Sequence, residues 1–341
     1  MNHKIEFPHK LLGEDGALIE PGWANKLIME YNPLDVRAHK MRIKEWDYYI
    51  IVDNDGYAFS TTVADNRYMG LANSTFMDFN ESYRQKFITP ILLPMGGLFL
   101  PTDSSKGDIY IKKNLSSISI IHEKGGRRLT GHFKKSMLNE RLDFDIFLYD
   151  NKNDDTMVIA TPWEEDKTAF YYNQKINCMP AEGYVKLDGR LHTFSPDKDF
   201  GTLDWGRGVW TYDNTWYWAS GNGYVNGKRF GYNIGYGFGN TLAASENMIF
   251  YDGKCHKIDR IRFEIPEGNI LQPWKFVSSD GRFDMDFFPV YDNSSNLNAL
   301  FISQVQHQVF GRLNGKAVLD DGTVLKIENL LTFAERVRNR Y

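Results

Sequence analysis

Cysteine is scarce in this chain of 341 residues, which contains only Cys178 and Cys255. Two cysteines so far apart cannot build a disulfide framework, and a chain without one is typical of a reducing compartment. The N-terminal residues MNHKIEFPHK also lack the apolar core of a signal peptide. Because no run approaches the roughly 18 apolar residues of a membrane-spanning helix, the sequence predicts a cytoplasmic protein with no transmembrane segment.

Positive charge is not in excess either. Lys and Arg number 40 against 44 Asp and Glu, which gives a formal net charge of −4. A nucleic-acid partner normally requires a basic stripe, so we predict no nucleic acid as a partner. The net charge likewise gives no support for electrostatic binding to an anionic membrane. The sequence leaves the oligomeric state open.

Motifs for metals and bound cofactors are missing as well. The eight histidines show neither His-x-His nor His-x-x-x-His spacing, and the cysteines are not clustered, so no metal site is predicted. No Gly-x-Ser-x-Gly nucleophile elbow is present. The segment GYGFGN (235–240) lacks the lysine of a phosphate loop and precedes no helical pattern. We therefore predict that the protein uses no cofactor.

Signals for turns and strands, in contrast, are abundant. Aromatic residues make up 15% of the chain, and they favour half-buried strands. Asp-Gly and Asn-Gly, the dipeptides that best tolerate type I′ hairpin turns, occur nine times: Asp15-Gly16, Asp55-Gly56, Asp188-Gly189, Asn222-Gly223, Asn226-Gly227, Asp252-Gly253, Asp280-Gly281, Asn314-Gly315 and Asp321-Gly322. In segments such as LDFDIFL (142–148), apolar and polar residues alternate as on a sheet with one wet face.

Long stretches of helical periodicity are rare. The best helix candidates are parts of 76–88 and the C-terminal FAERVRNRY. We therefore predict a mainly β protein with few short helices, built from closed or strongly curled antiparallel sheets. The length allows two domains, and the polar segments 150–155 and 192–201 mark the region of a boundary.

One expected strand has a face made largely of glycine. In RFGYNIGYGFGN (229–240), Tyr232, Ile234, Tyr236 and Phe238 share one face, and Asn233 lies on the other with three glycines. Glycine weakens a strand unless something approaches it closely. A ligand would explain this face, and so would a bulky residue from a neighbouring strand.

Half of the eight tryptophans lie in DWGRGVWTYDNTWYWASGNG (204–223), around one carboxylate and one guanidinium. An apolar environment raises the pKa of a carboxyl group, so Asp204 is a candidate proton donor near neutral pH. Arg207 would then position a polar group of the substrate. The alternative is an ion pair of Asp204 with Arg207 at a turn.

Two other side chains are catalytic candidates. Lys175 follows the aromatic run FYY and is a candidate base or cation, or else a strand lysine whose stem passes the aromatic rings to reach water. Glu246 is a candidate second carboxylate, or a loop-end residue that bonds the backbone.

The tryptophans are expected to bind the substrate. At least two of the four should line one cavity together with Tyr236 or Lys175. The predicted substrate-binding residues are Trp205, Trp210, Trp216, Trp218, Tyr172, Asn233 and Tyr236.

The segments KEWDYYIIV, FYYNQKINCMPAEGYV, LDWGRGVWTYDNTWYWASGNG and SSDGRFDMDFFP resemble a bacterial family known only as domain of unknown function 2804, from about Trp23 to the end. More remotely, the arrangement resembles the carotenoid 1,2-hydratase and tocopherol cyclase group, whose members carry two lipocalin-like barrels in tandem. The hydratases have an Asp-Arg-Glu-Trp type motif at the start of the second domain. The similar element here, Asp204-Trp205-Gly206-Arg207, lacks the glutamate and differs in order.

This resemblance implies two tandem lipocalin-like (calycin-type) β-barrels or curled sandwiches, which we place at 1–190 and 191–341. It also implies an acid role for Asp204. Three functions follow as hypotheses, in this order: an enzyme without cofactor that hydrates, isomerises or cyclises a hydrophobic unsaturated molecule such as a lipid or terpenoid; a non-catalytic binding protein for such molecules; and a structural or interaction module. An acid that points into a cavity would favour the first.

Overall fold

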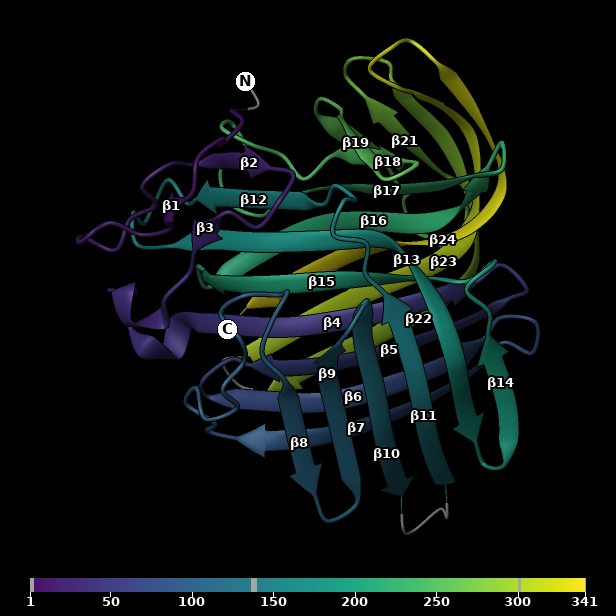
Figure 1. Ribbon diagram of the computed structural model, residues 1–341, viewed down its shortest axis with the longest axis horizontal. Coiled ribbons are helices and arrows are strands. Elements are labelled where there is room, and N and C mark those ends of the chain that lie inside the picture. Colours follow the sequence, from purple (N-terminus) through teal and green to yellow (C-terminus); the bar gives the residue numbers. More distant parts are fainter. Residues whose placement is uncertain (1–2, 136–139, 300–301, 341) are drawn as a thin grey trace.

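The computed structural model describes residues 3–135, 140–299 and 302–340. Nearly all regular structure is β, in two large antiparallel sheets (Figure 1). The first sheet curls into a nearly closed barrel and the second into a half-barrel, which confirms the predicted fold class. The helices of the described residues are the single turns η1 (Pro33–Asp35) and η2 (Lys40–Arg42), and the short strands β1 (His9–Lys10) and β3 (Met29–Glu30) form a separate pair.

The first sheet has thirteen strands, and its main path runs β7-β6-β5-β4-β15-β13-β11-β10-β9-β8. Its members are β2 (Gly22–Ala24), β4 (Ile43–Asp53), β5 (Tyr57–Asp65), β6 (Met69–Asp78), β7 (Tyr83–Leu92), β8 (Ile109–Lys113), β9 (Ser116–Glu123), β10 (Gly126–Lys135), β11 (Glu140–Tyr149), β12 (Met157–Pro162), β13 (Phe170–Leu187), β14 (Arg190–Phe194) and β15 (Phe200–Val209). The pairing of β13 with β15 shifts register between Ile176 and Met179, where Cys178 has a φ of 58°. This bulge bends the long strand, as bulges do, so that β8–β11 cross the direction of β4–β7 (Figure 1).

The second sheet has nine strands in the order β19-β18-β17-β16-β24-β23-β22-β21-β20. Its members are β16 (Asp213–Val225), β17 (Lys228–Tyr236), β18 (Met248–Tyr251), β19 (Lys254–Lys257), β20 (Ile261–Glu264), β21 (Trp274–Ser278), β22 (Phe283–Ala299), β23 (Ile302–Val318) and β24 (Val324–Arg340). The change of sheet falls between Val209 and Asp213, because β15 still pairs with β4 and β13 of the first sheet. The tryptophan-rich motif therefore spans the junction of the two sheets.

Most of the Asp-Gly and Asn-Gly dipeptides lie where two strands are joined. In Asn226-Gly227, for example, the φ values are 52° and 74°, as the turn between β16 and β17 requires. Two assignments are wrong: Asn222-Gly223 lies inside β16, and Asn314-Gly315 lies inside β23 at a register shift. In β16, the Asn222 side chain accepts a hydrogen bond from the Cys178 backbone and donates one to Thr202, so it joins the two sheets.

Both helix candidates are corrected by the structure. Residues 76–88 form the β6–β7 hairpin. Residues 333–340 of the C-terminal candidate lie in β24, and Tyr341 lies outside the described residues. Strand β24 pairs with β16 on one side and with β23 on the other. Two ladders of backbone hydrogen bonds outweigh the weak local preference of Ala, Glu and Arg for a helix.

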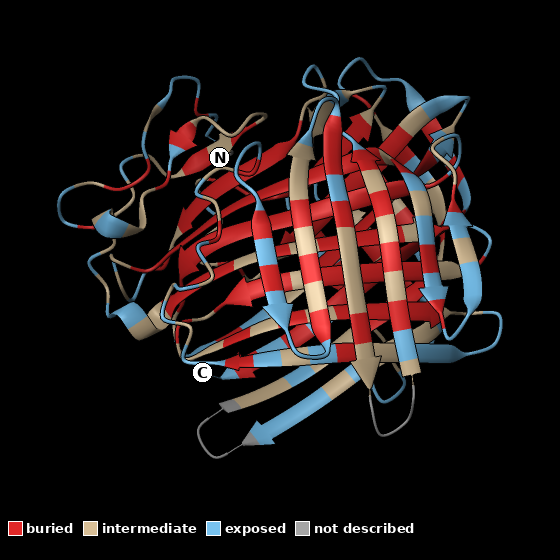
Figure 2. Ribbon diagram, turned by 60° about the horizontal axis from the view of Figure 1, so that its bottom comes forward, coloured by how far each residue is buried: buried red, intermediate tan, exposed pale blue. Residues whose placement is uncertain are grey.

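Burial follows the layers of the fold. In Figure 2 the crossing strands in front alternate between buried and exposed residues, whereas the strands behind them are buried over most of their length. One large apolar cluster fills the first barrel and reaches the second sheet through Trp218, Phe310 and Phe333. No helix in the described part of the chain is long and apolar enough to span a bilayer.

Candidate active site

A cavity of about 490 Å³ lies between the two sheets. Strands β4–β7, β13 and β15 of the first sheet form one wall, and β16 and β22–β24 of the second form the other. Its volume falls within the range of roughly 300–1,000 Å³ that small-molecule sites occupy. Because it joins an aromatic wall to several buried charged groups, this cavity is the candidate active site.

The aromatic wall comes from the tryptophan-rich motif. Trp210, Trp216 and Trp218 line the cavity with Tyr171 and Phe238. The ring centres of Trp210 and Trp216 are 5.2 Å apart, and Tyr171 stacks on Phe238 at 4.9 Å. Three of the four tryptophans of the motif therefore share one cavity with Lys175, which also lines it.

Asp204 and Lys175 are opposite each other on β15 and β13. The Lys175 Nζ lies 2.7 Å from the Asp204 Oδ1 and 4.2 Å from the centre of a Trp218 ring. Asn173 donates a further hydrogen bond to the same Asp204 oxygen at 2.7 Å. Both contacts are ones that an ionised carboxylate makes. Lys175 is 1% exposed, so its ammonium does not reach water as a snorkelling lysine would.

A second carboxylate on the cavity wall, Glu335 of β24, is absent from the sequence-based candidates. Its Oε1 accepts a hydrogen bond of 2.8 Å from Gln308, whose amide also contacts the Tyr48 hydroxyl at 2.9 Å. Burial, reinforced by the negative charge of Asp204, raises the pKa of Glu335 to about 7. This carboxyl group can therefore hold a proton at neutral pH and release it within the cavity.

Asp204 and Arg207 lie on opposite faces of β15, because strand side chains alternate and these two are three residues apart. Arg207 is fully buried outside the cavity, where it donates to Asp47 at 2.9 Å and to the backbone oxygens of Trp46, Gly206 and Pro101. The structure thus corrects both expectations for Arg207: it neither shares the cavity with Asp204 nor forms an ion pair with it.

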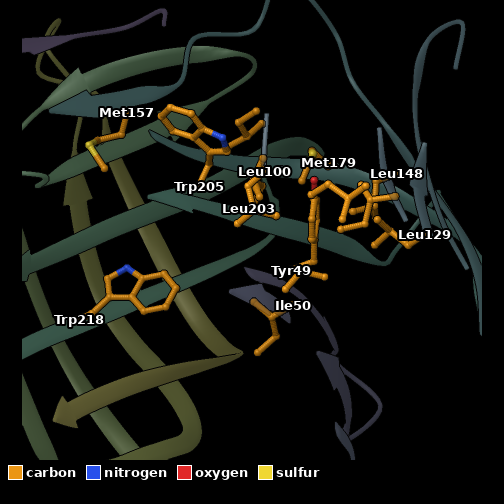
Figure 3. Close-up of a cluster of buried hydrophobic side chains, with 14 of the residues drawn as sticks. Tyr49, Ile50, Leu100, Leu129, Leu148, Met157, Met179, Leu203, Trp205 and Trp218 are labelled. Atoms are coloured by element: carbon orange, nitrogen blue, oxygen red, sulfur yellow. The ribbon is translucent and has the colours of Figure 1, made fainter. Parts of the chain in front are cut away.

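Two predicted binding residues share this opposite face. Trp205 packs edge-on against Tyr172 at 5.5 Å, and the Tyr172 hydroxyl donates to the Met29 oxygen at 2.7 Å. Figure 3 shows Trp205 beside Leu100 and Leu203, apart from Trp218. Neither Trp205 nor Tyr172 lines the cavity, contrary to expectation. They pack the core beneath it.

Three other candidates do not line the cavity. Asn233 accepts a hydrogen bond from the Trp218 indole at 2.6 Å and donates one to the Glu246 backbone. Both carboxylate oxygens of Glu246 are buried without a hydrogen-bond partner among the described residues. Burial, with a contribution from Asp204, raises the pKa of Glu246 to about 7. Tyr236 stacks on Tyr217 at 4.7 Å in the core of the second sheet, away from the cavity.

The glycine face of β17 is explained by packing. A Cβ on Gly235 would lie 2.1 Å from the Glu246 Oε1, and one on Gly231 would lie 2.6 Å from the Cys178 Sγ. These close approaches come from the chain itself. The missing side chain at Gly235 is what allows the Glu246 carboxylate to enter the interior.

Lys44 is another cavity residue that sequence reasoning did not identify. Its Nζ lies 4.1 Å from the centre of the Tyr68 ring, and burial, together with Arg42, lowers its pKa to about 7. For metals, no group of three or more His, Cys, Asp or Glu side chains with suitable spacing occurs in the described ranges.

The chain belongs to the family described as Domain of unknown function (DUF2804), which matches residues 2–341. This confirms the family suggested by the tryptophan-rich segments. No protein of curated function matches the sequence.

Solved structures share the fold at low identity. A protein of Nitrosomonas europaea provisionally named AttH is 13% identical, with a TM-score of 0.50 over 90% of this chain and 95% of that one. Kievitone hydratase of Nectria haematococca is 11% identical, with a TM-score of 0.50 over 98% of both chains. At these identities the likeness shows a common architecture of tandem β-barrels.

Proposed function

We propose that this protein is an enzyme that adds water to, isomerises or cyclises a hydrophobic unsaturated small molecule such as a lipid or terpenoid, with its own side chains as acid and base. The observation that carries the proposal is Glu335. This buried carboxyl group faces an aromatic cavity and has a pKa of about 7. The proposal reverses the role expected of Asp204. Because Asp204 is paired with Lys175, we assign the proton-donor role to Glu335 and the role of base to Asp204.

Glu335 is the acid in this scheme. It transfers its proton to one carbon of a double bond, and positive charge develops on the other carbon. The indole rings of Trp216 and Trp218 line the same cavity, and aromatic faces attract a cation by about 0.5–2 kcal/mol. A preorganised aromatic wall of this kind stabilises the charge as it forms.

Asp204 is the base. In hydration, a water molecule attacks the cation and its surplus proton passes to the Asp204 carboxylate, so that alkene and water give an alcohol. In isomerisation or cyclisation, the proton comes from a carbon of the cation instead. Transfer of the proton from Asp204 back to Glu335 completes the cycle. Lys175, at 2.7 Å, keeps Asp204 in place and balances its charge.

The fold is consistent with this scheme. Kievitone hydratase, which shares the tandem-barrel architecture, is by its name a hydratase. The substrate of that enzyme is not carried over to this chain, because the two sequences are only 11% identical.

Incorporation of solvent deuterium tests the proposal for all three reaction types. The protein is incubated in D₂O with a panel of unsaturated terpenoids, unsaturated fatty acids and prenylated phenols, and the products are analysed by mass spectrometry. We expect at least one compound to gain deuterium at carbon, and Glu335→Gln and Asp204→Asn to abolish the gain. Binding of panel members, seen as a change in tryptophan fluorescence, without any deuterium gain would identify a binding protein instead.

A further inference from the structure

A loop with a strongly apolar surface follows strand β7. Residues 92–99, the apolar loop, read LLPMGGLF and contain no charged side chain. Leu92 is 82% exposed, Leu93 63%, Met95 50% and Phe99 84%. Single exposed apolar residues are ordinary on protein surfaces, but a contiguous group of this size marks a surface that binds something.

The apolar loop is held in an unusual backbone conformation. Leu93, Met95 and Phe99 have φ values of 47°, 55° and 51°, a left-handed region that residues with bulky side chains rarely adopt. Such strain persists only where the surrounding structure imposes it, and it concentrates at functional sites.

A buried network imposes this conformation. The Asp65 Oδ2 accepts hydrogen bonds from the backbone of Gly96 and Leu98, at 3.0 and 3.4 Å. Arg67 pairs with Asp65 at 3.2 Å and with Glu45 at 2.9 Å. The exposed side chains of Leu93, Met95 and Phe99 are therefore held at the surface by a backbone that this buried network fixes.

The apolar loop adjoins the candidate active site. Gly70 lines the cavity, and a Cβ built on it would lie 3.0 Å from Pro94 and 3.2 Å from Leu98. Ile88 and Pro90 of β7 line both the cavity and a hollow on the other side of this edge strand. A lipophilic molecule that leaves the loop surface is thus already at the wall of the cavity.

Basic residues stand beside the apolar loop. The hollow that contains Leu92 is also lined by Lys113, Lys134 and Lys135. Lys135 pairs with Glu140 at 2.9 Å, whereas within the described ranges neither Lys113 nor Lys134 has an acidic partner within 4.0 Å. The net charge of −4 conceals this local excess of positive charge.

We propose that the apolar loop and the lysines beside it dock the protein on an anionic phospholipid bilayer, and that the substrate enters the cavity from that bilayer. Apolar side chains that insert at the boundary of head groups and acyl chains, flanked by lysines that attract anionic lipid, are how peripheral proteins bind membranes. The substrate part of this inference rests on the proposed function, and it narrows the substrate to a membrane-dissolved lipid.

Co-sedimentation with vesicles tests the docking. We expect the protein to bind vesicles of phosphatidylglycerol and phosphatidylcholine more tightly than vesicles of pure phosphatidylcholine. The variant Leu93→Asn/Phe99→Asn should bind at least about tenfold more weakly, because two apolar anchors are lost. Asparagine tolerates the left-handed conformation, so this variant should fold. The matched control is Leu191→Asn, a 60% exposed leucine on β14, at the opposite end of the molecule from the end of β7 (Figure 1).

The lysines have their own test. Lys113→Gln and Lys134→Gln should each weaken binding to the anionic vesicles about fivefold and leave binding to pure phosphatidylcholine unchanged. Equal binding of wild type and Leu93→Asn/Phe99→Asn would overturn the proposal. So would light scattering that shows a dimer for wild type and a monomer for this variant, since a second copy would then cover the loop.

Failure of docking and failure of the proposed function can be told apart. Substrates in free solution reach the cavity without a bilayer. The variants made for the vesicle experiments should therefore catalyse incorporation of deuterium from D₂O into the product as wild type does. Vesicle binding without deuterium incorporation would remove the enzyme proposal alone. Deuterium incorporation without vesicle binding would remove the docking proposal alone.

Discussion

Lys175 and Asp204 form a buried ion pair across two neighbouring strands, with 2.7 Å between Nζ and Oδ1. The pair lies at the centre of a group of charges, because Glu246 and Glu335 both sense the charges of Asp204 and Lys175. Three carboxyl groups share the ammonium of Lys175, with Lys257 as a further cation near Glu246, and they cannot all be ionised cheaply in an apolar interior. The two glutamates therefore hold protons near neutral pH, and this is the property that acid–base chemistry in the cavity requires.

A double-mutant cycle tests the ion pair. Lys175→Met leaves the Asp204 carboxylate without its partner in an apolar wall, and loss of one member of a buried pair costs about 3–5 kcal/mol. Lys175→Met/Asp204→Asn removes both charges and should recover much of this loss. Urea denaturation gives the free energies of unfolding. Lys326→Met, at a lysine 78% exposed, is the control. Strictly additive losses in the double variant would show that the two side chains do not interact.

Glu335→Gln should lower turnover by about 10²–10⁴-fold, the usual contribution of a positioned acid, and leave ligand binding nearly unchanged. The active form carries the proton, and the pKa of Glu335 is about 7. The rate of wild type should therefore fall as the pH rises through 7. Glu328→Gln, an exposed position on the same strand, is the control. A flat rate between pH 6 and 8 would exclude Glu335 as the acid.

Glu246 should make the stability of the fold depend on pH. Its pKa is raised from 4.5 to about 7 in the folded protein, so between these values the folded state holds a proton that the unfolded state has released. Stability contributed by this proton is complete below pH 4.5 and is lost as the pH rises to 7. At about 1.4 kcal/mol per unit, the loss is roughly 3 kcal/mol.

Glu246→Gln has no such proton to lose. It should match wild type in urea denaturation at pH 4 and be the more stable of the two at pH 8, whereas Glu267→Gln, on the exposed surface, should follow wild type throughout. If Glu246→Gln were instead the less stable protein at pH 8, the ionised carboxylate would be stabilised by a nearby cation such as Lys257, whose charge opposes the rise in the Glu246 pKa.

The architecture was predictable because its signals are local. Turn dipeptides such as Asn226-Gly227 and the alternation in residues 142–148 depend on backbone conformation and on one buried face, both of which a short segment encodes. The helix assigned to the C-terminus failed for the opposite reason. On one side, strand β24 pairs with β16, which lies more than a hundred residues earlier in the sequence. The local propensity of the C-terminal residues does not report such long-range pairing.

The same error concealed Glu335. Read as a strand, FAERV places Glu335 on the same face as Phe333 and Val337, both of which are 1% exposed, and an acid on an apolar face is a signal of function. Read as a helix, it is one of several charged residues on a wet surface. For Arg207, strand alternation was the available clue: three residues from Asp204 means the opposite face.

The last prediction concerns Arg207, whose contacts indicate that it stabilises the fold and takes no part in the reaction. Its guanidinium donates hydrogen bonds to Asp47 and to three backbone oxygens. One of these oxygens belongs to Pro101, in the segment that follows the apolar loop. Arg207→Gln leaves Asp47 unpaired in the interior, so we expect a loss of about 3–5 kcal/mol in the free energy of unfolding.

Turnover per folded molecule should stay near that of wild type, since the Arg207 side chain lies on the face of β15 opposite the cavity. Arg336→Gln, at an exposed position on β24 of the second sheet, serves as the control for loss of an arginine. The decisive comparison is with Asp204→Asn, three residues away. That variant should lose turnover at nearly native substrate affinity, whereas Arg207→Gln should lose stability at nearly native turnover. A collapse of turnover in Arg207→Gln at native stability would place the guanidinium in the reaction and contradict the strand geometry.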